Sequence, residues 1–331
     1  MTTVYFVRHA EAEGNTYRRM HGQYNSLITE NGVRQIEALR ARFEDIPIDA
    51  CYASDLYRTC RTAQAVYLPQ KLPLHPDRRF RETGVGCWED VPFGWLERFD
   101  KSNMDDFNNN ERVWQVAGSE TWEAYTSRFL QGLHEIAAQN DARTIAIFTH
   151  ACVLRGVQKR LLKTDALPFC ENTAVSRLCW RDGEITFDFV NDASHLSPEI
   201  STMQRQQRLK QGATDRADYS LWFEKAADAA ETWLAKLRDK PVGQLVLGGD
   251  AQDTGVILEL SLDEAYRGRR FGQQLLGQAV SVLRNHGAKK IRVDVPDTNV
   301  QAAHFFRENG FVPQASDGAV LFKDIEVRPL P

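Results

Sequence analysis

The chain has 331 residues, 42% of them hydrophobic and 26% charged, and its formal net charge is −4. This length is typical of about two domains, and the composition excludes a disordered chain and a fibrous repeat. With 45 acidic residues against 41 basic ones, the chain has no overall positive field to attract nucleic acid or anionic lipid. An anionic ligand must therefore be held by a local cluster of cations, and we expect neither a nucleic-acid nor a membrane partner.

Two further features of the sequence concern location and redox state. The first apolar run is short and meets charge directly at Arg8, unlike a signal peptide, and no apolar stretch approaches the roughly 20 residues that span a bilayer. The six cysteines all precede residue 180 and include no CxxC pair. We therefore expect a cytoplasmic protein with reduced thiols and no metal site.

The first half of the chain alternates β-type runs with amphipathic helices. Helices are predicted at 30–43, 56–67 and 121–138, and strands at 3–7, 49–53, 144–148, 176–180 and 185–190. Strands that alternate with helices at this spacing predict a doubly wound, mostly parallel α/β sheet. We assign this first domain to residues 1–195.

The sequence becomes polar after about residue 191, and we expect a linker at 196–214. The second domain, 215–331, begins with a stretch that we expect to be helical as far as about residue 237. Strands are predicted next at 242–247, 255–262 and 290–295, and helices at 272–285 and 300–309. A second α/β unit follows from this order.

Two histidines and two arginines fall where strands of the first domain end. His9 follows the strand 3–7 with Arg8 beside it, and His150 follows the strand 144–148. Arg58 lies in the first turn of the helix after the strand 49–53. Open α/β sheets bind ligands beyond the carboxyl ends of their strands, so we expect these side chains to form one cationic pocket for a phosphate.

Five segments in this order resemble the motifs of the histidine phosphatase superfamily, whose fold is phosphoglycerate-mutase-like. The segments are Arg8-His9-Ala10-Glu11 with Asn15, then 22–32, 52–59, 81–89 and 148–151. Five matches in sequence over residues 2–190 are specific, whereas a single RHA triplet would be weak. Ala10 and Ala151 replace glycines that are usual in the family, but neither change removes a reacting group.

The resemblance implies a role for each matched residue. His9 would be the nucleophile that forms a phosphohistidine, and Glu82 would protonate the leaving oxygen and then activate water. The phosphoryl oxygens would be held by Arg8, Arg58, His150 and Asn15. The implied activity is a metal-independent phosphomonoesterase acting on a small phosphorylated metabolite. A phosphoglycerate-type mutase and a phosphate-binding pseudoenzyme are the alternatives, and the absence of the long insertions of glycolytic mutases favours the phosphatase.

A second anion site is indicated in the second domain. The strand 255–262 leads through Arg267-Gly268-Arg269-Arg270-Phe271-Gly272 into a helix, and backbone N–H groups at such a helix start bind anions. This loop resembles the acetyl-CoA loop of the GNAT N-acetyltransferases, (Q/R)xxGx(G/A). Asn299 and the Gly-Phe pair at 310–311 resemble later parts of that family. The resemblance covers about residues 215–331.

The GNAT resemblance implies acetyl-CoA as cofactor and an amine as acceptor. Two positions depart from the family: Arg270 stands at its central glycine, and Phe306 stands where many members have a tyrosine that protonates the leaving thiolate. Glu259 is a candidate base. Acetyl transfer, acyl-CoA binding without turnover and a purely structural domain therefore all remain open, and the sequence carries no signal for the oligomeric state.

Overall fold

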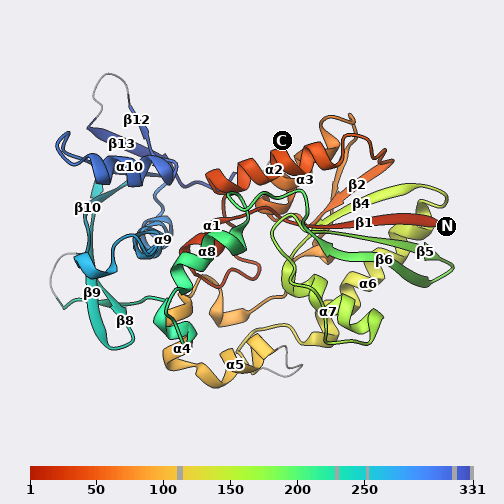
Figure 1. Ribbon diagram of the computed structural model, residues 1–331, viewed down its shortest axis with the longest axis horizontal. Helices are drawn as coiled ribbons and strands as arrows, with labels where there is room; N and C mark the ends of the chain where they lie inside the picture. Colours follow the sequence, from red (N-terminus) through yellow and green to blue (C-terminus); the bar gives the residue numbers. More distant parts are fainter. Residues whose placement is uncertain (110–114, 228–230, 251–252, 315–318, 329–331) are drawn as a thin grey trace.

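Two sheets with helices packed on them make up the protein, described here from a computed structural model for residues 1–109, 115–227, 231–250, 253–314 and 319–328. Figure 1 shows the two sheets at opposite ends of the molecule, with α1, α8 and α9 between them. The first sheet has the order β3-β2-β4-β1-β5-β6. Its strands are β1 (Thr2–Arg8), β2 (Ala50–Ala53), β3 (Leu74–Pro76), β4 (Thr144–Thr149), β5 (Val175–Arg181) and β6 (Glu184–Asp192).

The first unit is the expected doubly wound α/β fold. Strands β1, β2, β3 and β4 pair in parallel, while β5 and β6 are antiparallel. Side chains of β1 alternate between the faces: Val4 and Phe6 join one buried cluster, and Tyr5 and Val7 join the other. The first cluster includes residues of α6 (Trp122–Gln139) and α7 (Ala151–Leu162), and the second includes residues of α2 (Glu30–Arg42) and α3 (Tyr57–Tyr67).

Short helices occupy the connections around the carboxyl end of this sheet. They are α1 (Glu13–Tyr17), η1 (Arg78–Phe80), η2 (Gly86–Trp88), α4 (Phe93–Phe99) and α5 (Lys101–Asn109). The sequence pattern predicted none of these helices. Four of them have seven residues or fewer, too few to establish a helical period, and α5 has nine. None of the helices in the described ranges has both the length and the apolar character needed to cross a bilayer.

The second sheet has the order β12-β13-β11-β10-β9-β8-β7. Its strands are β7 (Trp222–Lys225), β8 (Glu231–Leu237), β9 (Lys240–Asp250), β10 (Thr254–Leu262), β11 (Lys290–Asp294), β12 (Val312–Pro313) and β13 (Val320–Asp324). Strands β10 and β11 are parallel, and helix α9 (Phe271–Asn285) connects them. Helix α10 (Val300–Glu308) and a 3₁₀ turn, η4 (Glu264–Tyr266), complete the unit.

The prediction of a helix before about residue 237 is wrong. The segment instead contains β7 and β8, which pair antiparallel with Trp222 opposite Lys236. Aromatic and β-branched residues such as Phe223, Thr232 and Trp233 favour strands when they pack on a half-buried sheet, and here that tertiary packing outweighs the helix propensity of the neighbouring Ala, Glu and Lys residues.

The two units share a packed interface rather than a simple tether. Tyr17 of α1 belongs to the hydrophobic core of the second unit. Arg284 of α9 forms an ion pair with Glu13 of α1 at 3.1 Å, and both side chains are largely buried. The segment 196–214, expected to link the units, contains α8 (Thr202–Lys210). A 3₁₀ turn, η3 (Arg216–Asp218), follows this segment. Helix α1 is therefore held by both units.

Gly277 is the point of closest approach between α9 and α1. A Cβ atom added there would lie 2.4 Å from the Cβ atom of Tyr17, next to its backbone, where a rotamer change gives no relief. We expect Gly277→Val to lower the free energy of unfolding by about 1–3 kcal/mol through overpacking. Thermal denaturation measures this loss, and Gly249→Val on β9 is the matched control because a Cβ there meets nothing within 4 Å. Equal stability of the two variants would contradict the interface.

Candidate active site

The carboxyl ends of β1 and β4 meet in one cavity. These strands are parallel neighbours with Arg8 opposite Thr149, so the residues that follow them lie together. The cavity, of about 430 Å³, is lined by five of the residues singled out in the sequence: Arg8, His9, Asn15, Arg58 and Glu82. The sixth, His150, is buried beside His9, with 5.2 Å between the ring centroids. The structure thus brings the whole predicted set together.

His9 is held as a neutral imidazole in a defined orientation. Its Nδ1 lies 2.7 Å from the carbonyl oxygen of Ala10, which can only accept, so Nδ1 carries the proton and Nε2 keeps its lone pair. Burial, with added repulsion from Arg58 and then Arg8, lowers the pKa of His9 well below its ordinary value of 6.5. The ring is therefore an available nucleophile or acceptor.

His150 is the N-cap residue of α7 and is fully buried. Its Nε2 lies 2.9 Å from Ser54 Oγ, while its Nδ1 is buried without a hydrogen-bond partner among the described residues. Burial, followed by the charge of Arg58, also lowers the pKa of His150. A hydroxyl donating to Nε2 would place the ring proton on Nδ1, the nitrogen left for a ligand. Sequence reasoning gave Ser54 no such role, although it lies in a matched motif.

Backbone carbonyls hold the two arginines. Arg8 Nη1 donates to the Cys170 carbonyl at 2.5 Å, and its buried Nε has no partner among the described residues. Arg58 donates to the Tyr24 and Gly22 carbonyls at 2.9 and 2.7 Å. Burial is the main cause that lowers the pKa of Arg58 to about 10. Among the described residues neither arginine forms an ion pair with a carboxylate, although the charges of Glu82 and Glu89 act to raise the pKa of Arg58. Both guanidiniums can therefore bind an anion.

Two asparagines connect α1 to His9. Asn15 Oδ1 accepts hydrogen bonds from the Ala12 backbone at 3.0 Å and from Asn172 Nδ2 at 3.3 Å, which leaves the Nδ2 group of Asn15 for a ligand. Asn172 Nδ2 also donates to the His9 carbonyl at 3.0 Å. Asn172 was missed by sequence reasoning because an asparagine between a helix and a strand has no motif that singles it out.

Glu82 belongs to the loop between η1 and η2, and its carboxylate contacts the N-terminus of α7. Its Oε1 accepts from the backbone N–H groups of Thr83 and Val153 at 3.0 and 2.8 Å, and its Oε2 accepts from that of Cys152 at 3.1 Å. Arg128 donates to the Glu82 carbonyl at 2.8 Å and so fixes the loop that carries the carboxylate. Arg128, in the middle of a predicted helix, carried no sequence signal for this role.

Helix α8 forms a further wall of the same cavity. Four of its residues line it: Thr202, Met203, Gln206 and Lys210. Ser201, which caps the helix, donates to Glu171 Oε2 at 2.8 Å, and Gln206 donates to the Asn15 carbonyl at 3.1 Å. A segment predicted only as a linker therefore completes the site of the first unit.

The predicted acyl-CoA loop joins β10 to α9. Gly268 has φ +73°, and Arg270 is the left-handed N-cap of α9 with φ +63°. The left-handed conformation at position 270 explains why glycine suits this position, and it costs a non-glycine residue such as Arg270 about 1–2 kcal/mol. Arg270 donates from Nε to Gln273 at 2.9 Å and from Nη1 to the Arg205 carbonyl of α8 at 3.4 Å. Phe271 is fully buried in the core.

The remaining loop residues have local roles. Arg267 Nε donates to the Leu262 carbonyl at 3.0 Å, Arg269 lies over the Phe271 ring, and a Cβ at Gly272 would meet the Phe305 ring at 3.1 Å. Asn299 caps α10 by accepting from the Ala302 N–H at 3.0 Å. Because β10 and β11 are parallel, the loop and Asn299 follow strands that end at the same edge of the sheet.

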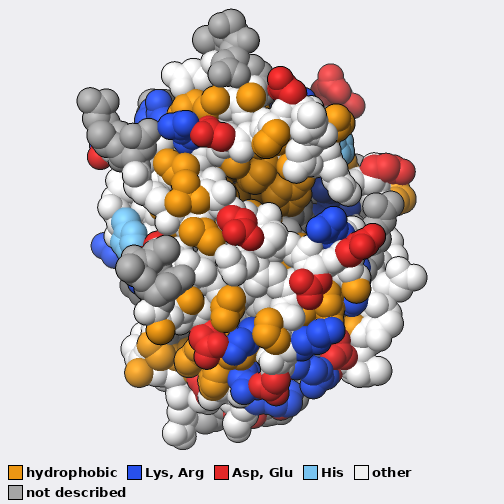
Figure 2. Space-filling view, turned by 90° about the vertical axis from the view of Figure 1, so that its left-hand side faces the viewer, with side chains coloured by type: hydrophobic (Ala, Val, Ile, Leu, Met, Phe, Trp, Pro, Cys, Tyr) orange, Lys and Arg blue, Asp and Glu red, His pale blue; other side chains and the backbone are white. Residues whose placement is uncertain are grey.

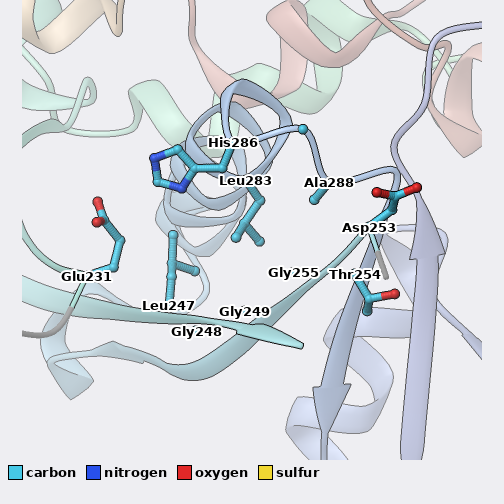
Figure 3. A pocket seen from close by; sticks show the side chains of 11 residues that line it. Glu231, Leu247, Gly248, Gly249, Asp253, Thr254, Gly255, Leu283, His286 and Ala288 are labelled. Carbon is cyan, nitrogen blue, oxygen red and sulfur yellow. The ribbon is translucent and has the colours of Figure 1, made fainter. Parts of the chain in front are cut away.

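A cavity of about 500 Å³ in the second unit lies at the opposite edge (Figure 3). It is lined by Thr254 and Gly255 at the start of β10 and by residues around the end of α9, with Glu231 and His286 on its wall. The cavity is therefore separate from the predicted acyl-CoA loop.

Figure 2 shows exposed hydrophobic side chains over the middle of the face of this unit, and Lys and Arg mixed with acidic residues toward its lower edge.

No group of three or more His, Cys, Asp or Glu side chains is arranged to hold a metal within the residues that the structure describes.

Comparison with known protein families gives two matches. The model of the histidine phosphatase superfamily (branch 1) matches residues 4–193, and that of the acetyltransferase (GNAT) family matches residues 198–311. The first match covers more than half of the chain. Together they confirm the two resemblances drawn from the sequence.

Several known proteins are similar to about three fifths of the chain. A metal-independent phosphoserine phosphatase of Arabidopsis thaliana is 28% identical over 214 residues, which are 62% of this chain and 87% of that protein. A probable phosphoglycerate mutase GpmB of Salmonella choleraesuis (strain SC-B67) is 24% identical over 215 residues, 62% of this chain and 100% of that protein. The structure of Bacillus stearothermophilus YhfR is 27% identical with a TM-score of 0.57, covering 60% of this chain and 100% of that one.

The lowered pKa of His9 gives a direct prediction for its titration. A group whose pKa is lowered stays neutral as the pH falls through its ordinary value, so His9 should remain neutral, with its proton on Nδ1, at pH 6.5. NMR of the imidazole nitrogens measures this state. Arg58→Gln removes the second cause of the lowering and should move the titration upward. A midpoint at or above 6.5 in the unaltered protein would contradict the geometry.

Proposed function

The chain belongs to the histidine phosphatase superfamily (branch 1), and on this premise we propose that its first unit is a metal-independent phosphomonoesterase that works through a phosphohistidine. Its substrate is a small phosphorylated metabolite. The observation that carries the proposal is the 2.7 Å contact between His9 Nδ1 and the Ala10 carbonyl, because it leaves Nε2 unprotonated beside two arginines.

In the first step His9 Nε2 attacks phosphorus, and the bond from phosphorus to the ester oxygen breaks. Arg8 and Arg58 stabilise the negative charge on the transferred oxygens, and His150 Nδ1 and Asn15 Nδ2 donate to the same oxygens. Glu82 acts as the general acid and gives a proton to the departing alkoxide, so that the leaving group departs as an alcohol.

In the second step Glu82, now a carboxylate, takes a proton from water as the water oxygen attacks the phosphohistidine. The bond from nitrogen to phosphorus breaks, inorganic phosphate leaves, and His9 returns to its neutral form. The three backbone N–H groups that donate to Glu82 keep its carboxylate in one place through both steps. No step requires a metal ion.

Release of phosphate from p-nitrophenyl phosphate tests this function. His9→Ala should abolish turnover, and Glu82→Gln should lower kcat by about 10²–10⁴-fold, the usual contribution of general acid–base catalysis. Activity should survive EDTA unchanged, since no metal takes part. Glu123→Gln, an exposed change of the same type, is the control. Full activity of His9→Ala, or loss of activity with EDTA, would refute the proposal.

A mutase differs from a phosphatase in the acceptor of the phosphoryl group. The relatives named as probable phosphoglycerate mutases make this comparison necessary. With 3-phosphoglycerate as substrate, NMR of phosphorus separates the two reactions: a phosphatase accumulates inorganic phosphate, while a mutase accumulates 2-phosphoglycerate. We expect inorganic phosphate.

We also propose that the second unit binds acetyl-CoA through the loop Arg267–Gly272 and transfers the acetyl group to an amine. The match to the GNAT family and the position of the loop before the fifteen-residue helix α9 support this proposal. Backbone N–H groups at the start of α9 suit a pyrophosphate, and Arg267, Arg269 and Arg270 add positive charge. Phe306 offers no acid for the thiolate, so release of CoA depends on solvent or another group.

Two glycines allow a matched test of this loop. Gly268 and Gly287 both have positive φ, at +73° and +87°, and a side chain would meet nothing within 4 Å at either one. We expect Gly268→Val to weaken acetyl-CoA binding by at least about 10-fold, which is about 1.4 kcal/mol, because it disturbs the anion loop. Gly287→Val, at the far end of α9, should bind normally. Calorimetry that detects no acetyl-CoA binding to the unaltered protein would refute the proposal.

A further inference from the structure

The cavity of the first unit is larger than a phosphate group requires. Its volume is about 430 Å³, whereas a water molecule in the liquid occupies about 30 Å³. The proposed phosphate contacts come from β1, from α3 and from Asn15 of α1, whereas α8 and Arg18, at the C-terminal end of α1, form another wall. The cavity therefore has room beside a phosphate group for a second portion of a substrate, next to α8 and the end of α1.

Some of the charged side chains that line the cavity already have a partner, and others do not. Arg19 is paired with Asp90 at 2.7 Å, and Glu171 accepts from Ser201 and from the Met203 N–H. Glu82 is satisfied by backbone donors, and Arg8 and Arg58 are assigned to the phosphate. The lining cations left over are Arg18 and Lys210, and neither forms an ion pair with an acidic side chain that the structure describes.

Arg18 is fixed in place with hydrogen-bonding capacity to spare. It is the left-handed C-cap of α1, and its guanidinium carbon lies 4.7 Å from the ring centroid of Phe93 and 4.9 Å from that of Tyr219. Its Nη2 donates to Ser220 Oγ at 3.0 Å, whereas its buried Nε has no partner among the described residues. A planar cation held by two rings is well prepared to bind an anion at its edge.

Lys210 is the last residue of α8 and lines the same cavity as Arg18. Burial and then the charges of Arg18 and Arg216 lower the pKa of Lys210, while the charge of Glu171, which also lines the cavity, raises it. Burial is also the main cause that lowers the pKa of Arg18, which the charge of Glu97 raises. Two cations that repel each other across a cavity gain free energy when an anion enters between them.

We propose that Arg18 and Lys210 form a second anion subsite, and that the substrate is a phosphomonoester carrying another anionic group, a carboxylate or a second phosphate. This inference rests on the proposed phosphatase function and specifies its substrate class. Lys210 lies outside the residues that the phosphatase family model matches and inside those that the acetyltransferase model matches, so a residue of the second match completes the subsite.

The test compares ligands that differ in the second anion alone. Calorimetry on the full chain with His9→Ala, which prevents turnover, measures the affinity for phosphoserine against phosphoethanolamine, and for fructose 1,6-bisphosphate against fructose 6-phosphate. We expect at least about 10-fold tighter binding of the doubly anionic member of one pair, a typical effect of a charged hydrogen bond. The first pair identifies a carboxylate, and the second identifies a phosphate.

In the His9→Ala chain, the further substitution Arg18→Gln should reduce the preference for the doubly anionic ligand by about 10-fold, and so should Lys210→Gln. Arg205→Gln is the matched control, because this cation is also on α8 but does not line the cavity. Equal affinity within both pairs, or a preference unchanged by both substitutions, would overturn the subsite. A preference for the doubly anionic ligand, together with no release of phosphate from p-nitrophenyl phosphate by the unaltered protein, would support the subsite and refute the phosphatase function.

Discussion

The hydrogen bond from His9 Nδ1 to the Ala10 carbonyl is the interaction on which the rest of the site depends. It fixes which nitrogen is free, and burial beside Arg8 and Arg58 keeps that nitrogen unprotonated. Two buried guanidiniums on a chain of net charge −4 need support, and backbone carbonyls from distant loops provide it. On the proposed mechanism, an incoming phosphate would therefore meet preformed positive charge and would not have to assemble it.

The second unit is part of this construction. Helix α1 carries Asn15, and it is packed against α9 through Tyr17 and Gly277 and paired with α9 through Glu13 and Arg284. Helix α8 adds a wall to the cavity and accepts a hydrogen bond from Arg270 of the predicted acyl-CoA loop. The two predicted sites are thus joined through one short helix, and the first unit is not complete when considered without the segment that follows it.

The sequence was most informative where chemistry and periodicity coincide. The parallel strands and the cluster of His9, His150, Arg8 and Arg58 could be predicted, because apolar runs locate strands and strand ends locate ligands. Residues that act by holding others, such as Asn172, Arg128 and Ser54, could not, since their roles depend on contacts between distant segments. The place of helix α8 at the cavity lacked a signal for the same reason, because it follows from tertiary packing against Glu171 and α1.

Arg270 illustrates a prediction that the structure explains in physical terms. Its departure from the family's glycine was evident in the sequence, but only the backbone shows that the position is left-handed and that the side chain reaches α8. The segment before residue 237 shows the opposite case, in which local propensity suggested a helix and sheet packing formed β7 and β8.

The most direct test of the account is to trap the covalent intermediate. The unaltered protein, mixed with a phosphomonoester and quenched in alkali within one turnover, should yield a single phosphorylated peptide containing His9, with the phosphoryl group on Nε2. A phosphoryl group on any other residue, or turnover of substrate with no phosphorylated protein at any time, would contradict it.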